Sequence, residues 1–344
     1  MAAEVGKNAR RGLPHSSVIA ATSYAYPSEL VSNEDFAARC EFRPTTSYAE
    51  LTALSGMKTR RWCAPSENTR TLTDAAVTRL LAEEPELCGE IDLVVVASGT
   101  TLNMAHPSDP ENRSMADLSP FVLEMLGRKR ALGLDIKACY CSGFLRGVQV
   151  VDSLLANENY RAALLVAVEQ GSRFATAATN KSSFCFIVAD AAGVVVFRRG
   201  ERREGAGIID YVGHTEVDKR TWVGIGEDAA SMTMLGSKAA EATQKLLVEC
   251  GRTLLWRNGL TPNDVNWLLP IQTHGGLLSG VLSELEWPRE RMLWFGDVNG
   301  FSGSASIPSC LAEQTRFGRV RRGDLVLSLA VGAGLNCAGA LYRY

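Results

Sequence analysis

Long apolar runs are missing from this sequence: none approaches the roughly 20 residues that a membrane-spanning helix needs. The basic residues near the start are not followed by the apolar stretch of a secretory signal, so residues 1–15 are expected to be a disordered leader. An excess of one charge is missing too, because 36 Lys and Arg face 38 Asp and Glu. The sequence therefore predicts a cytoplasmic protein that its overall charge does not draw to a membrane or to nucleic acid.

Cysteine spacing of the kind that holds a metal is also absent. The nine cysteines are scattered, and Cys139 and Cys141 have no second half-site that would complete a zinc centre. A chain of 344 residues can bury a large core without disulfides. We therefore expect mostly buried thiols in a reducing compartment, and neither a metal nor a bound cofactor.

Apolar runs that alternate with helical segments predict an α/β protein. Near-continuous apolar runs are typical of strands that are covered on both faces. Six runs have this character: residues 17–22, 91–98, 162–168, 193–197, 265–270 and 325–331. Two segments between them, 71–81 and 235–255, have helical periodicity and few breakers. Alternation of this kind is typical of layered α/β folds.

An internal repeat gives the organisation in more detail. Ser142-Gly143 aligns with Ser302-Gly303 at an offset of 160 residues, and the same offset places Val166 on Val326. The alternative is chance similarity between two ordinary α/β segments. We interpret the repeat as two copies of one motif, so that residues 16–200 form an N-terminal half and residues 201–344 a C-terminal half.

Cys141 is the candidate nucleophile. It stands where a strand-like segment ends and a helix begins, and Ser142-Gly143 follows it as a tight turn. Unpaired backbone N–H groups and the positive end of a helix dipole favour the thiolate, so the position predicts a lowered pKa. Cys139 competes for this role, but only Cys141 adjoins the turn and the helix start.

Several motifs, in order along nearly the whole chain, resemble those of β-ketoacyl-acyl carrier protein synthase III, a condensing enzyme of the thiolase superfamily. The nucleophile segment is Cys-Ser-Gly-Phe at residues 141–144. Residues 56–61 read Gly-Met-Lys-Thr-Arg-Arg, residues 304–308 read Ser-Ala-Ser-Ile-Pro, and residues 331–334 read Val-Gly-Ala-Gly. Each is similar to a segment of that family.

The resemblance implies a thiolase-like fold of five layers, αβαβα, with internal duplication, in a homodimer. It implies that an acyl group moves from a coenzyme A or acyl carrier protein thioester onto Cys141 and then to a second substrate. The tetrahedral intermediate would be stabilised by the backbone amides of Cys141 and Ala333. Glycines at 332 and 334 allow the close backbone approach that such a loop requires.

Two side chains of the family pattern are replaced. The family pairs its cysteine with a histidine and an asparagine, which polarise the malonyl carbonyl and stabilise the enolate. Ile271 stands at the histidine position and Phe301 at the asparagine position, and the repeat independently sets Phe301 opposite Cys141. We therefore predict transfer to a non-standard acceptor, in fatty-acid-like or polyketide (secondary-metabolite) biosynthesis, rather than efficient malonyl decarboxylation.

Histidines elsewhere are candidates for the missing base. His274 follows Ile271 by one helical turn if a helix begins there, and Asp297 or Asn299 would orient it. His214 is the rival, because the family carries a histidine near that point. His106 is expected at the tunnel mouth and His15 in the disordered leader. Two further alternatives stay open: a Claisen condensing enzyme that uses His274, and an inactive subunit of a heterodimer.

Other polar residues receive structural or donor-binding interpretations. Asp135 and Asp190 are expected to cap backbone amides. Glu50 and Leu54 stand where the family holds coenzyme A between a tryptophan and an arginine, which favours a carrier-protein donor. A basic cluster is the candidate surface for an acidic carrier protein: Lys58, Arg60, Arg61, Arg128, Lys129 and Arg130.

Overall fold

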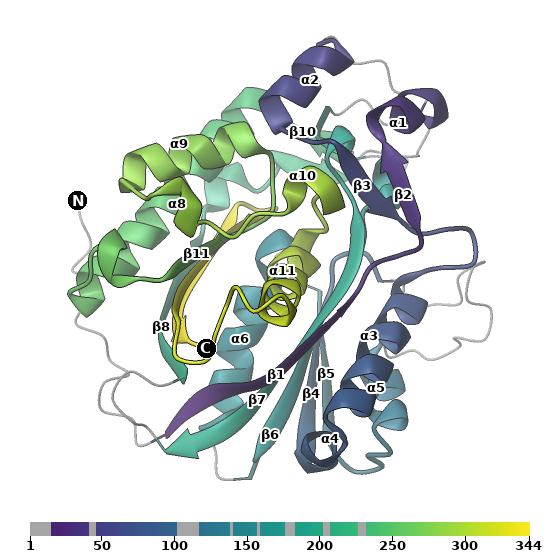
Figure 1. The fold of residues 1–344 in the computed structure, drawn as a ribbon, viewed down its shortest axis with the longest axis vertical. Helices are drawn as coiled ribbons and strands as arrows, with labels where there is room; N and C mark the ends of the chain where they lie inside the picture. Colours follow the sequence, from purple (N-terminus) through teal and green to yellow (C-terminus); the bar gives the residue numbers. More distant parts are fainter. Residues whose placement is uncertain are drawn as a thin grey trace.

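Two β-sheets and three helical layers alternate through the molecule (Figure 1). The computed structural model describes residues 15–40, 46–101, 117–137, 140–156, 159–175, 183–201, 207–225 and 232–344. In the first sheet the strand order is β1 (His15–Ala25), β7 (Asp190–Glu201), β6 (Ala162–Gln170), β4 (Ile91–Ala97) and β5 (Leu132–Ile136). In the second it is β11 (Trp267–Pro270), β12 (Leu325–Gly332), β13 (Asn336–Arg343) and β8 (Gly207–Thr215).

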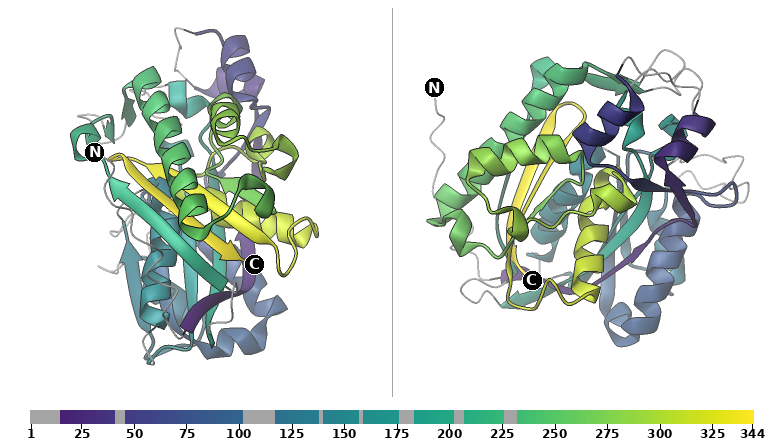
Figure 2. Two further views of the ribbon diagram at one scale, coloured as in Figure 1. Left: turned by 90° about the vertical axis from the view of Figure 1, so that its left-hand side faces the viewer. Right: turned by 45° about the horizontal axis from the view of Figure 1, so that its top comes forward.

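The central layer consists of α6 (Gly143–Leu155) and α11 (Ser306–Arg316), which lie between the sheets. On α6 the buried residues Phe144, Val148, Val151 and Leu155 recur every three or four positions, which is the spacing of one helix face. The outer face of the first sheet is covered by α3 (Thr69–Glu83), α4 (Pro85–Glu90) and α5 (Ser119–Met125). The outer face of the second is covered by α8 (Gly236–Asn258) and α9 (Gly275–Leu285), as Figure 2 shows from two further directions.

The two sheets share one pairing scheme. In the first, β1 and β7 are antiparallel, β7 and β6 are antiparallel, and β6 and β4 are parallel. In the second sheet, β8 and β13 are antiparallel, β13 and β12 are antiparallel, and β12 and β11 are parallel. The molecule therefore has the predicted five-layer αβαβα architecture with internal duplication.

Smaller elements surround the ends of the two sheets. On one side lie the antiparallel strand pair β2 (Glu29–Ser32) and β3 (Thr59–Trp62) and the two helices between them, α1 (Asn33–Arg39) and α2 (Tyr48–Ser55). The pair β9 (Val223–Ile225) and β10 (Met232–Met234) precedes α8, and α7 (Ser172–Ala175) and α10 (Gly296–Asn299) are single turns. Two short 3₁₀ turns matter for the site: η2 (Tyr140–Ser142) and η7 (Gly303–Ala305).

All six predicted strands and both predicted helices are present, with ends shifted by a few residues. His15, which was expected in a disordered leader, is the first residue of β1 and pairs with Glu201. The rest of the predicted leader lies outside the described residues. Among the helices of the described residues, none combines the length and the apolar character of a membrane span.

Gly193 allows the central layer to touch the first sheet. A Cβ atom at this position would lie 2.5 Å from the backbone nitrogen of Ser309 and 2.8 Å from the backbone carbon of Pro308, both on α11. Backbone atoms cannot move aside cheaply, so we expect Gly193→Ala to lower the free energy of unfolding by about 3 kcal/mol. Urea denaturation would measure this change in the free energy of unfolding. Gly89→Ala is the control, since no atom lies within 4 Å of its added Cβ; equal effects of the two changes would contradict the packing argument.

Candidate active site

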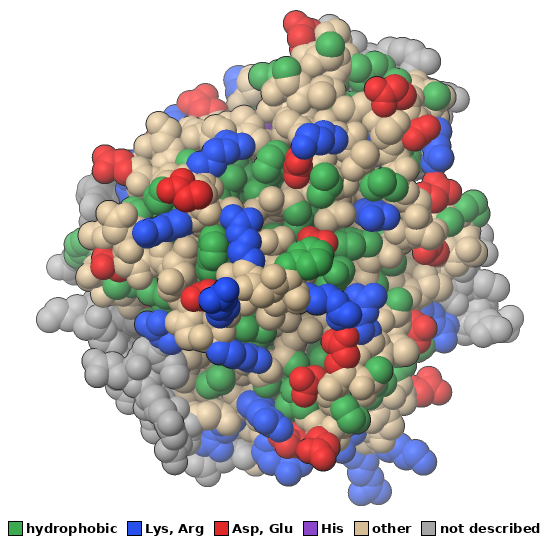
Figure 3. Space-filling view, viewed as in Figure 1, with side chains coloured by type: hydrophobic (Ala, Val, Ile, Leu, Met, Phe, Trp, Pro, Cys, Tyr) green, Lys and Arg blue, Asp and Glu red, His purple; other side chains and the backbone are tan. Residues whose placement is uncertain are grey.

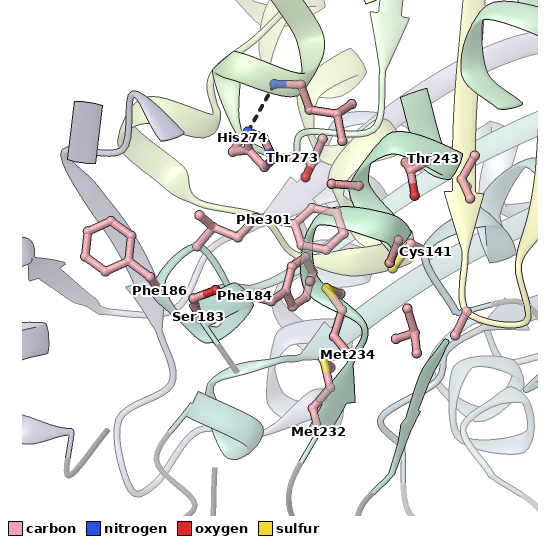
Figure 4. Close-up of a pocket in the computed structure, with 18 of the residues that line it drawn as sticks. Cys141, Ser183, Phe184, Phe186, Met232, Met234, Thr243, Thr273, His274 and Phe301 are labelled. Carbon is pink, nitrogen blue, oxygen red and sulfur yellow. Dashed lines mark hydrogen bonds between the residues drawn. The ribbon is translucent and has the colours of Figure 1, made fainter. Parts of the chain in front are cut away.

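Cys141 borders a cavity of about 490 Å³ that is walled by both halves of the chain (Figure 4). The first half contributes Cys141 and Phe184, and the second contributes Thr243, Ile271 and Phe301. Among the described residues that line this cavity, none is Asp, Glu, Lys or Arg. The space therefore suits an uncharged, mainly apolar acyl group.

The turn that presents Cys141 is conformationally unusual. Cys141 is the middle residue of η2, between β5 and α6. Its neighbour Tyr140 has a φ of 39°, a left-handed value that residues other than glycine seldom adopt. The ring of Tyr140 packs directly on Gly99, where any Cβ atom would collide with it. This packing holds the turn in its strained form.

The electrostatics of Cys141 differ from the sequence-based prediction. Burial, followed by the carboxyl group of Glu169, raises the pKa of the Cys141 thiol to about 12, whereas the backbone hydrogen bond at the turn lowers it by less. The prediction of a lowered pKa was therefore wrong, because desolvation and a nearby carboxylate outweigh the helix start. Cys141 is held mainly as a neutral thiol at neutral pH.

Glu169 is a buried carboxyl group at the end of β6, and sequence reasoning missed it. It accepts hydrogen bonds from the Gly99 amide at 3.0 Å, the Thr100 hydroxyl at 2.6 Å and the Ser304 hydroxyl at 2.7 Å. Burial raises its own pKa. Because Ser304 belongs to η7, Glu169 joins the nucleophile's half of the fold to the equivalent turn in the other half.

The two residues predicted to supply the oxyanion amides border the same cavity. Ala333 lies in the turn between β12 and β13, and the cavity wall includes Val331, Gly332 and Ala333 together with Cys141. Gly334 has a φ of 124°, which favours glycine and turns the chain back into β13. The arrangement is compatible with two amide donors at one carbonyl oxygen.

Ile271 and Phe301 occupy the cavity wall as apolar side chains. Both are buried, and both line the cavity with Cys141. The Phe301 ring packs edge-on against Phe184, with a centroid distance of 5.4 Å. The positions where the family places polar groups therefore carry no donor or acceptor for a thioester carbonyl.

His274 lines the cavity, but its imidazole ring forms hydrogen bonds with backbone groups. No helix begins at Ile271: α9 begins at Gly275, with His274 as its N-cap. The Nδ1 atom accepts a hydrogen bond from the Leu277 amide at 3.0 Å, and the Leu54 carbonyl also interacts with the ring. Burial lowers the pKa of His274. In Figure 4 the ring lies on the far side of Thr273 and Phe301 from Cys141.

The predicted orienting partners of His274 lie elsewhere. Asp297 and Asn299 are on α10, and neither lines the cavity. Asp297 forms an ion pair with Lys58 at 3.0 Å, and the side-chain amide of Asn299 donates to Glu313 at 3.5 Å. The expectation that either would orient His274 was wrong, because α10 directs both toward another surface.

His214 is also outside the cavity. It lies on β8, where its Nε2 atom is 3.0 Å from Glu216 and its Nδ1 atom is 3.3 Å from the sulfur of Cys337. The strand that carries it pairs with β13, which places the imidazole beside the second sheet and not beside Cys141. His106 and Cys139 lie outside the described residues.

The structural roles predicted for two acids are confirmed. Asp135 accepts hydrogen bonds from the amides of Leu118 and Ser119, each at 3.0 Å. Asp190 accepts from the amides of Cys63 at 2.7 Å and of Ser172 at 2.8 Å.

The predicted basic cluster is not a single surface. Arg60 is fully buried between the rings of Phe36 and Phe186, and burial lowers its pKa to about 10. Lys58 is paired with Asp297. Figure 3 shows Lys and Arg interspersed with Asp and Glu on the face that carries α9, α10 and α11.

Thr243 and Thr273 bring hydroxyl groups to the cavity wall among mostly carbon atoms (Figure 4). The order of residues alone gives no sign of them, because each is an ordinary threonine in its own segment. Within the described residues, no group of three or more His, Cys, Asp or Glu is placed to hold a metal ion.

Comparisons with known proteins agree on one family. The family described as 3-oxoacyl-[acyl-carrier-protein (ACP)] synthase III matches residues 134–217, and its C-terminal part matches residues 255–344. The chain is 30% identical to β-ketoacyl-[acyl-carrier-protein] synthase III of Rhodospirillum centenum, over 96% of this chain and all of that protein.

Solved structures give the same result. The chain is similar to 3-oxoacyl-(acyl carrier protein) synthase III of Pseudomonas aeruginosa, with 25% identity and a TM-score of 0.83 over 96% of this chain and 98% of that one. It shares its fold with the priming β-ketosynthase of the R1128 polyketide pathway, with 22% identity and a TM-score of 0.81 over 95% and 96% of the two chains.

Proposed function

Because the chain belongs to the 3-oxoacyl-[acyl-carrier-protein] synthase III family of the thiolase superfamily, a family of acyltransferases, we propose that it acylates itself on Cys141 and passes the acyl group to an acceptor other than malonyl thioester. One observation carries the proposal: Cys141 shares a cavity with Ala333, Ile271 and Phe301. The residues proposed as the nucleophile and as the oxyanion donors line this cavity, whereas Ile271 and Phe301 stand where the family has its enolate-stabilising side chains.

The first step follows from the chemistry of these groups. The Cys141 sulfur bonds to the carbonyl carbon of the donor thioester, and the amides of Cys141 and Ala333 stabilise the oxygen that becomes negative. The bond between that carbon and the donor sulfur then breaks, and the Cys141 proton leaves with the donor thiol. The raised pKa of Cys141 keeps the thiol protonated until the proton can move in this way.

The second step needs an acceptor with its own nucleophile. An amine, hydroxyl or thiol attacks the acyl-cysteine at the same oxyanion site and takes the acyl group, and the Cys141 thiol is restored. No enolate forms, so the absence of polar side chains at positions 271 and 301 does not prevent this reaction. Acceptors of this kind are common in polyketide and other secondary-metabolite biosynthesis, where we place the enzyme.

The donor is proposed to be an acyl carrier protein rather than coenzyme A. Glu50 is the partner of Ser47 in the capping box of α2, and Leu54 is 61% exposed at the cavity. Neither offers the flat stacking surface on which adenine binds well. Intact-mass spectrometry with matched acyl chains on carrier protein and on coenzyme A would test the choice; faster loading from coenzyme A would contradict it.

A panel of thioesters tests the function itself. We expect a mass increase of one acyl group on incubation with an apolar acyl thioester, and its loss when an amine, hydroxyl or thiol acceptor is added. The rate of malonyl-carrier decarboxylation, measured as released carbon dioxide, is expected to be near background. Rapid decarboxylation would favour the second candidate, a condensing enzyme, for which the position of His274 on the cavity wall is the supporting observation.

Substitution of His274 separates these two candidates. We expect His274→Asn to keep acyl transfer and stability close to wild type, because asparagine caps helices well and cannot act as a base. His274→Ala is expected to lower the free energy of unfolding by about 1 kcal/mol through loss of the cap. Transfer rates and urea denaturation would be measured together. A stable His274→Asn protein without activity would assign the imidazole a chemical role.

We also propose a homodimer, formed along β5. This strand is at the edge of the first sheet and pairs only with β4 among the described strands. It carries Leu132, Leu134 and Ile136, and exposed apolar edges of this kind favour pairing with another strand. The presence of Cys141 and Ala333 in the wall of one cavity counts against an inactive subunit. Light scattering of the purified chain is expected to give twice the mass of 37.2 kDa; a monomer would contradict the proposal.

A further inference from the structure

A second cysteine cluster lies apart from Cys141, at the junction of α8 with the second sheet. Cys337 is on β13 and Cys250 is on α8, and the two thiols are hydrogen-bonded to each other. The sulfur of Cys337 is also 3.3 Å from Nδ1 of His214, and Nε2 of His214 is 3.0 Å from Glu216. A thiol, an imidazole and a carboxylate thus stand in a row, with a second thiol behind the first.

This environment favours a thiolate at Cys337. The hydrogen bond from Cys250, together with His214 and Arg146, lowers the pKa of Cys337 although burial opposes the shift. Arg146 lies close by, since its guanidinium donates to the Cys337 carbonyl at 2.9 Å. By contrast, burial raises the pKa of Cys310 well above the ordinary value, and that of Cys141 to about 12. An acidic thiol beside a second thiol is the usual arrangement of a redox-active pair.

We propose that Cys250 and Cys337 are a redox-active pair that hydrogen peroxide converts to a disulfide. The Cys337 thiolate attacks one peroxide oxygen, and the hydroxide that leaves takes a proton from His214 and becomes water. Cys337 is then a sulfenic acid. The Cys250 thiol attacks that sulfur, the S–S bond forms, the S–O bond breaks, and the hydroxyl group leaves as water with the Cys250 proton. One peroxide is reduced to two waters, and two thiols are oxidised.

Access to the pair is narrow. Cys337 and Cys250 are 0% and 2% exposed. The His214 side chain lies against the Cys337 sulfur and is itself 43% exposed to solvent. A small oxidant can pass beside an imidazole at the surface, but a bulky disulfide cannot. We therefore expect hydrogen peroxide to act faster than glutathione disulfide at equal concentration.

Peptide mapping tests the proposal independently of acyl transfer. Trypsin releases Cys250 in the peptide 246–252 and Cys337 in the peptide 323–343, and neither peptide holds another cysteine. After peroxide treatment of the whole protein we expect these two peptides to be joined, with the loss of two hydrogen atoms, and to separate on reduction. Peroxide treatment that leaves both peptides unlinked, or that links either to a different cysteine, would overturn the proposal.

Variants test the role of His214. We expect His214→Ala to slow formation of the linked peptide about tenfold at pH 7, because less Cys337 is then thiolate. Cys88→Ser, which removes a buried thiol on α4 far from the pair, is the control and is expected to link at the wild-type rate. An unchanged rate in His214→Ala would contradict the assignment of the imidazole. Circular dichroism of each variant would confirm that it is folded.

Discussion

Replacing Cys141 with alanine is expected to abolish acyl loading, with the rate falling on the order of 10³-fold or more. Serine at the same position is expected to restore little of the loading, because a hydroxyl is a much weaker nucleophile than a thiol. Both replacements are small, and Cys141 is partly exposed in the cavity, so folding is expected to be retained. Intact-mass spectrometry after incubation with an acyl thioester measures the loading directly.

The matched control for this change is again Cys88→Ser, which should load at the wild-type rate. Peptide mapping of the loaded wild-type protein should find the acyl group on the tryptic peptide that contains Cys141, and tandem mass spectrometry should assign it to that sulfur rather than to Cys139. Loading that persists in Cys141→Ala, on any residue, would remove the basis of the proposed function.

Glu169→Gln is expected to lower the pKa of Cys141, because the change removes the carboxyl group that adds to the effect of burial. Below its pKa a thiol gains about tenfold in thiolate for each unit of pH, so a lower pKa moves the whole reactivity curve toward lower pH. We expect alkylation of Cys141 by iodoacetamide at pH 8 to accelerate about tenfold. The rate should be measured from pH 7 to pH 10 in both proteins.

The control for Glu169→Gln is Asp190→Asn. Asp190 is an equally buried carboxyl group on β7, with hydrogen bonds to Cys63 and Ser172, and it is not among the groups that shift the pKa of Cys141. We expect Asp190→Asn to lower stability and to leave the alkylation curve of Cys141 in place. If Glu169→Gln leaves that curve in place as well, burial alone sets the pKa of Cys141.

The sequence contained enough to predict the fold and to place Cys141 at a turn between a strand and a helix. Buried strands such as β4 and β6 are continuous apolar runs. The repeat in which Ser142 is equivalent to Ser302 can be recognised from residue order alone. The apolar character of positions 271 and 301 is likewise visible in the sequence. Strands with mixed faces, such as β8, which ends in polar and exposed residues, lack the apolar signal and were not predicted.

The predictions that failed depended on contacts between distant segments. The pKa of Cys141 is raised first by burial and then by Glu169, and both effects arise from segments that are distant from Cys141 in the sequence. The start of α9 at Gly275 decides that His274 is a cap, and residue spacing placed that start one turn too early. Arg60 was predicted to belong to a basic surface, but its guanidinium is buried between the rings of Phe36 and Phe186.

The apolar wall formed by Ile271 and Phe301 has a consequence for the lifetime of the acylated protein. Water that enters beside the acyl-cysteine finds no carboxylate or lysine among the described residues that line the cavity, and the one histidine there is engaged with backbone groups. Without a group to activate it, water is a poor competitor for an acceptor that the cavity holds beside the acyl carbon. The loaded enzyme should therefore persist, and turnover should be governed by the arrival of the acceptor rather than by spontaneous hydrolysis.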